Sequence, residues 1–148
     1  MMPLNVAKTV TVLLTILLSL ESPGAEVQLA QQPNLSPDGE TLLFARDGDI
    51  WKVPTRGGQA SRVTFDSTNE SQPIYSPDGD RIAFRSDRPG SNQVYVMPAS
   101  GGEPKQLTFH SEGYSLQDWY PDGKSLLVLA SRDHHWRSAS RFFRISAS

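Results

Sequence analysis

The turn sequence Ser-Pro-Asp-Gly constrains this chain most, because it occurs three times at nearly even spacing. The copies are Ser36-Pro37-Asp38-Gly39, Ser76-Pro77-Asp78-Gly79 and the variant Tyr120-Pro121-Asp122-Gly123. They begin 40 and then 44 residues apart, which is the period of one four-stranded propeller blade. Proline fixes φ at the second position of a type I turn, and the final glycine takes the left-handed conformation of a three-residue hairpin loop. Each copy therefore predicts a turn between two antiparallel strands.

Short apolar segments recur in step with these turns. In the first repeat they are a strand from about Gln31, then Thr41–Ala45, Asp49–Val53 and Ser61–Phe65, with a Gly57-Gly58 turn before the last. In the second repeat they are Gln72–Tyr75, Arg81–Arg85, Gln93–Met97 and Lys105–Phe109, with the turn at Gly101-Gly102. The third repeat has Gln117–Tyr120 and Lys124–Leu129, and its final run Arg141–Ser148 aligns with Gln93–Ser100.

These segments predict an all-β fold, a partial β-propeller of four-stranded antiparallel blades. We expect two complete blades, at about 31–66 and 72–110, and most of a third at about 115–148, without its outer strand. A blade cannot bury its apolar faces alone, and a closed propeller needs about four to eight blades. We therefore expect the ring to be completed by further blades of a longer chain or by other copies in a homo-oligomer.

The first 25 residues have the pattern of a secretory signal peptide. Lys8 supplies the positive charge of the amino-terminal region, Thr9–Leu20 is an apolar run, and Ser22–Ala25 offers small residues for cleavage. The apolar run is too short to cross a bilayer comfortably, which argues against a permanent membrane anchor, the alternative interpretation. We therefore expect a periplasmic or secreted protein whose propeller region is 26–148.

Charge and composition exclude several classes of function. The 14 Lys and Arg residues nearly balance 16 Asp and Glu residues, so the chain has no overall attraction to nucleic acid. It contains no cysteine, which rules out disulfides, thiol catalysis and zinc-thiolate sites.

Few residues have the pattern of a catalytic or metal site. Gly113-Tyr114-Ser115 begins like a nucleophile elbow, but Gln117 stands in place of the second glycine and a hairpin turn follows. The turn aspartates lie on different repeats, and they most simply accept N–H bonds within their own turns. We predict no catalytic residue, no cofactor and no metal site, and expect an enzyme only if the chain is a fragment of a longer peptidase.

The loops between the second and third strands of a repeat vary in length, as binding loops do. We predict that six loop residues form a partner surface. They are Arg88, Asn92, His134, His135, Trp136 and Arg137. In a strand the two adjacent histidines would point to opposite faces, and no third ligand lies at metal spacing. We therefore interpret them as an exposed loop pair and not as a metal site.

The repeats resemble those of TolB-like propellers and of the amino-terminal propeller of tricorn-type peptidases. The resemblance depends on three features of the repeats. These are the Ser-Pro-Asp-Gly turns, the corresponding segments Asp49–Pro54 and Val94–Pro98, and the Gly-Gly turns before Arg62-Val63-Thr64 and Gln106-Leu107-Thr108. Gly48–Trp51 and Leu107–Ser111 are more similar to the tricorn-type group. The resemblance implies a propeller that binds other proteins, or one that serves a peptidase whose catalytic machinery lies in other domains.

Three functions fit these observations. The first is a noncatalytic module that binds a protein or peptide in the cell envelope. The second is the front of a tricorn-like secreted serine peptidase. The third is a structural protein whose copies assemble into a ring.

Overall fold

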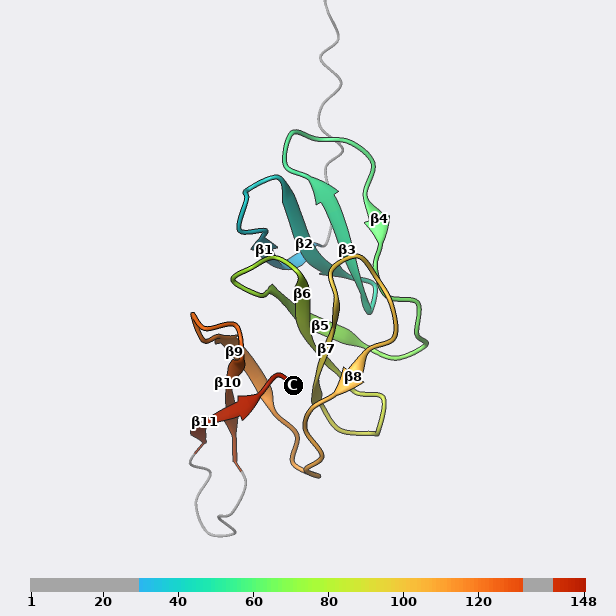
Figure 1. Ribbon diagram of the computed structural model, residues 1–148. Coiled ribbons are helices and arrows are strands. Elements are labelled where there is room, and N and C mark those ends of the chain that lie inside the picture. The colour runs from blue at the N-terminus through green and yellow to red at the C-terminus, as the bar shows by residue number, and fades with distance from the viewer. Residues whose placement is uncertain (1–29, 132–139) are drawn as a thin grey trace, which may run out of the picture.

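Three antiparallel sheets follow one another along the chain in the computed structural model, which describes residues 30–131 and 140–148 (Figure 1). Blade 1 contains β1 (Gln31–Leu35), β2 (Thr41–Arg46), β3 (Asp49–Pro54) and β4 (Ser61–Arg62). Blade 2 contains β5 (Glu70–Tyr75), β6 (Arg81–Ser86), β7 (Gln93–Pro98) and β8 (Lys105–Gln106). Blade 3 contains β9 (Ser115–Trp119), β10 (Ser125–Ala130) and β11 (Arg141–Ser146). The predicted all-β partial propeller, with two four-stranded blades and a third of three strands, is confirmed.

The three blades share one register. Thr41 pairs with Pro54, Arg81 with Pro98, and Ser125 with Ser146. The residue after Pro54, Pro98 or Ser146 makes the same backbone hydrogen bond in each blade. The N–H groups of Thr55, Ala99 and Ala147 each donate to a carbonyl 2.8–2.9 Å away. A residue of one blade can therefore be compared position by position with its counterparts in the other two.

The outer strands are shorter than the sequence predicts. We expected strands at Ser61–Phe65 and Lys105–Phe109, but β4 and β8 have two residues each. The reason is that Thr64 and Thr108 accept the next ladder hydrogen bonds with their side-chain hydroxyls, each at 2.9 Å, and not with the backbone.

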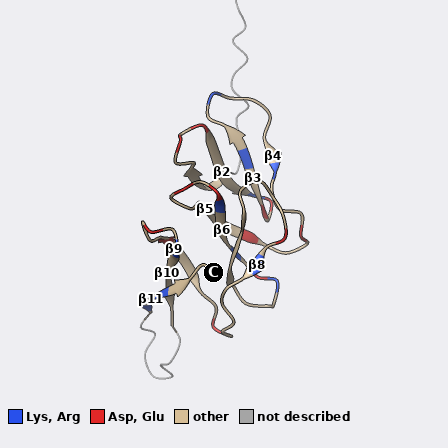
Figure 2. Cartoon of the chain, in the orientation of Figure 1, with Lys and Arg blue, Asp and Glu red and all other residues tan. Residues whose placement is uncertain are grey.

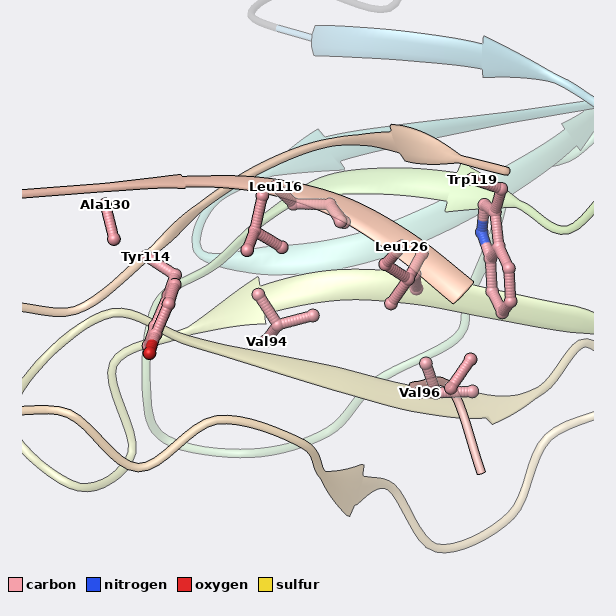
Figure 3. Close-up of a cluster of buried hydrophobic side chains, with 10 residues drawn as sticks. Val94, Val96, Tyr114, Leu116, Trp119, Leu126 and Ala130 are labelled. Carbon is pink, nitrogen blue, oxygen red and sulfur yellow. The ribbon is translucent and has the colours of Figure 1, made fainter. Parts of the chain in front are cut away.

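Apolar side chains from neighbouring blades form two separate cores. Between blades 1 and 2 the core consists of Leu43, Ala45, Ile50, Ile82, Phe84, Tyr95 and Met97. Between blades 2 and 3, Leu116 and Leu126 of blade 3 face Val94 and Val96 of blade 2 (Figure 3). Alternate residues of β6 and β7 enter opposite cores because side chains alternate across a strand, so blade 2 is buried on both faces.

The innermost strands are joined across blades by polar side chains. Gln32 and Gln72 lie at register shifts with φ of 54° and 52°, a left-handed conformation common at bulges. The Gln32 side chain accepts a bond from the Gln72 backbone N–H at 2.6 Å. Asn34 accepts from the Tyr75 N–H at 2.8 Å, so the bulged strands of blades 1 and 2 are fixed relative to each other.

Candidate functional site

The Pro-Asp-Gly turns of all three blades and the Gly-Gly turns of blades 1 and 2 lie at the same end of the blades, which we call the turn face. Gly39, Gly79 and Gly123 have φ of +75°, +79° and +63°, and each donates its N–H to the carbonyl of the first turn residue at 2.8–2.9 Å. In the second type of turn, Gly57 and Gly101 donate to the carbonyls of Pro54 and Pro98 at 3.0 Å, and Gly58 and Gly102 follow at φ +136°. These short, internally bonded turns give the face a fixed shape.

The carboxylates of the proline turns are held in place. Asp38 Oδ1 accepts the Glu40 N–H at 3.0 Å and the Ser36 hydroxyl, and Asp78 makes the equivalent pair of contacts. The serine hydroxyls, followed by these backbone N–H groups, hold the pKa of both carboxyls below the usual value. Asp122 lacks a serine partner because tyrosine begins its turn, although it accepts the Lys124 N–H at 2.9 Å.

A groove of about 730 Å³ lies on the turn face between blades 1 and 2. Its walls include Asp38, Thr41 and Lys52 from blade 1 and, from blade 2, Tyr75, Asp78, Asp80 and Ala99. Figure 2 shows the acidic positions on the turns that join β1 to β2 and β5 to β6. Burial, and then the charge of Asp38, raise the pKa of Tyr75, and this tyrosine lines the groove with its aromatic side chain.

Arg88 packs into the interface between blades 1 and 2. Its guanidinium forms ion pairs with Glu70 and, at 3.3 Å, with Asp66. It also lies 5.2 Å from the centre of the Tyr95 ring. Glu70 is 2% exposed, so the positive charge of Arg88 compensates a buried carboxylate and joins the linker between blades to the second blade.

The remaining residues of the predicted partner surface are only partly described. Asn92 is exposed, and its backbone carbonyl accepts the Tyr114 N–H at 2.7 Å. His134, His135, Trp136 and Arg137 lie outside the described residues.

Ser115, from the segment that begins like a nucleophile elbow, and the nearby His110 both have local partners. Ser115 on β9 accepts a bond from the Gln117 side chain at 3.1 Å. His110 Nδ1 accepts the Glu112 N–H at 3.2 Å. Within residues 30–131 and 140–148, no three His, Cys, Asp or Glu side chains gather closely enough to hold a metal ion. The same residues form no helix of the length and apolarity needed to span a membrane.

The repeated four-stranded sheets and their shared turn face define a β-propeller module. The chain belongs to the family described as the tricorn protease N-terminal β-propeller domain, whose model matches residues 27–148.

Three known proteins illustrate the similarity. Tricorn protease homolog 1 of Streptomyces coelicolor is 40% identical over 60 residues, which are 40% of this chain and 6% of that protein. A TolB-like structure from Agrobacterium tumefaciens matches 80% of this chain and 46% of its own at 23% identity, with a TM-score of 0.69. TolB from Acinetobacter baumannii matches 77% and 28% at 32% identity, with a TM-score of 0.58. The chain thus spans less than half the length of each.

Proposed function

We propose that this chain is a noncatalytic propeller module of the periplasm or the extracellular space, and that it binds a protein or peptide. The observation that carries the proposal is the groove between blades 1 and 2, because it is preformed between two turns with fixed backbones. A rigid site loses little conformational entropy on binding, so a short peptide segment can bind it usefully. The likeness to TolB supports an envelope location.

Peptide-library panning tests this proposal. The full-length polypeptide, as the cell makes it, is immobilised and panned with a random peptide library, and recovered peptides are measured by fluorescence anisotropy. We expect saturable binding that Ser61→Trp weakens, because Ser61 is exposed and lines the groove. Lys105→Trp is the control, since Lys105 begins β8 as Ser61 begins β4. Recovery of no binding peptide would refute the proposal.

A second candidate is the amino-terminal propeller of a tricorn-like serine peptidase. It is favoured by the family match and by the 40% identity to the Streptomyces protein. In that case the propeller steers peptides toward a catalytic domain of a longer polypeptide. A fluorophosphonate probe should then label a native polypeptide well above the 16.3 kDa of this chain. An unlabelled native polypeptide would exclude a serine peptidase.

A further inference from the structure

The two interfaces between blades are built alike on the turn face. A Cβ placed on Gly79 would lie 3.5 Å from the Pro37 ring, and one placed on Gly123 would lie 3.8 Å from the Pro77 ring. In both interfaces the turn proline of one blade therefore packs over the turn glycine of the next. Differences between the interfaces arise from the side chains around this shared contact.

In the interface between blades 2 and 3, the side chain of Arg81 lies beside this proline–glycine contact. Arg81 begins β6, directly after the turn of blade 2. Its guanidinium donates to the carbonyl of Gly123 and, at 3.5 Å, to the carbonyl of Ala147. It also lies 4.9 Å from the centre of the Trp119 ring. Blade 3 thus offers a guanidinium two carbonyl oxygens and one aromatic face.

In the interface between blades 1 and 2, the arginine is missing from a site that is otherwise matched. The shared register places Thr41 where blade 2 has Arg81. Tyr75, Gly79 and Ala99 stand where blade 3 has Trp119, Gly123 and Ala147, and all three line the groove. Within the described residues, the carbonyls of Gly79 and Ala99 accept no hydrogen bond. The short threonine side chain therefore leaves open the space that the arginine fills next door.

The charge around the groove favours a cation. Asp38, Asp78 and Asp80 line it, against a single basic residue, Lys52. Lys52 forms no ion pair with any described carboxylate. A guanidinium suits the site better than an ammonium, since its planar fork of donors can reach two carbonyls while its face stacks on a ring.

We propose that the groove receives the guanidinium of an arginine side chain from a partner protein or peptide. This inference rests on the proposed peptide-binding function and names the group that is recognised. The guanidinium donates to the carbonyls of Gly79 and Ala99, lies over Tyr75, and is attracted by Asp78 and Asp80.

The test uses a defined probe, acetyl-Gly-Arg-Gly-amide, with versions that carry citrulline or lysine in place of arginine. Binding to the full-length polypeptide is followed by ligand-detected NMR. Citrulline keeps the shape of arginine without its charge, and we expect it to bind about tenfold more weakly, as expected for the loss of a charge-assisted hydrogen bond. We expect the lysine peptide to bind more weakly than the arginine peptide.

Two variants in the groove and one control variant outside it locate the site. Thr41→Arg reproduces the side chain of blade 2 and should abolish binding of the arginine peptide, whereas Ser111→Arg adds the same charge at an exposed position outside the groove and should not. Asp80→Asn should weaken binding about threefold, the effect of one exposed ion pair. It keeps the test valid if Thr41→Arg does not fold.

The outcomes separate this inference from the proposed function. Equal binding of the arginine and citrulline peptides, or full binding by a folded Thr41→Arg variant, would overturn the arginine site. If panning still recovers peptides in that case, the peptide-binding module stands. If panning recovers no peptide, the proposed function fails, and the arginine site fails with it.

Discussion

The most direct test of the interface argument is the replacement of Arg81 by alanine. Arg81→Ala removes the guanidinium that joins blade 2 to the turn of blade 3, and it leaves the two β-sheets intact. The Gly123 carbonyl that it bonds belongs to a buried residue. That carbonyl therefore loses its charged donor when the arginine is removed.

The expected loss of stability follows from the contacts. A hydrogen bond from a charged donor contributes about 1.5–3 kcal/mol, and a cation over an aromatic ring about 0.5–1 kcal/mol at a partly exposed site. The longer contact to Ala147, at 3.5 Å, adds little. We therefore expect Arg81→Ala to destabilise the interface between blades 2 and 3 by about 3 kcal/mol.

Hydrogen exchange measured by mass spectrometry checks this value in a polypeptide of any length. The peptide that contains the turn 120–124 should exchange about a hundredfold faster in the variant, which corresponds to about 3 kcal/mol. Arg46→Ala is the control, because Arg46 is exposed and its nearest carboxylate is Asp47 of the same hairpin, at 3.2 Å. Equal exchange in the two variants would refute the role of Arg81 and the comparison on which the arginine groove rests.

Three further outcomes follow from the turns and strands. Gly113→Ala should destabilise far more than Gly39→Ala, because a Cβ at Gly113 would lie 2.7 Å from a backbone carbonyl, while one at Gly39 meets nothing within 4 Å; comparison of their melting temperatures checks this. Thr64→Val removes a buried hydroxyl that accepts a ladder bond and should cost about 1–3 kcal/mol in urea unfolding, because a buried N–H is left without a partner. The depressed pKa values of Asp38 and Asp78 stabilise the fold above the ordinary carboxyl pKa of 3.8. This stabilisation is lost as the pH falls through the lower folded values, so Ser76→Ala should reduce the acid-induced drop in melting temperature, and an unchanged drop would contradict this account.

The fold was predictable because its signals are local. Proline and glycine set the backbone of each turn, and the spacing of the turns sets the blade. The alignment of Arg141–Ser148 with Gln93–Ser100 required only matching apolar segments, and the observed register agrees with it. The outer strands were predicted too long because nothing local reveals that Thr64 and Thr108 pair through their hydroxyls.

The groove could not be predicted, because it depends on contacts between blades. Thr41 and Arg81 occupy the same register position, and only the packed structure shows that one reaches across to the next blade. Arg88 is a similar case. It lies in a loop of variable length, which suggested a role in binding, but its guanidinium turns inward to Glu70 and Tyr95. A repeat pattern predicts equivalent positions, but the side chains at those positions decide which interfaces are filled.

The sheet order has a consequence for how the protein folds. Within each sheet the hydrogen-bonded strands follow one another in sequence, and at most ten residues separate the two strands of a pair, so each ladder loses little chain entropy when it closes. The apolar faces, in contrast, meet across about one repeat of chain. We expect the ladders of individual blades to form early and the docking of one blade on the next to limit the folding rate. During synthesis on the ribosome, the hairpins of a blade therefore form before the next blade is available to dock on it.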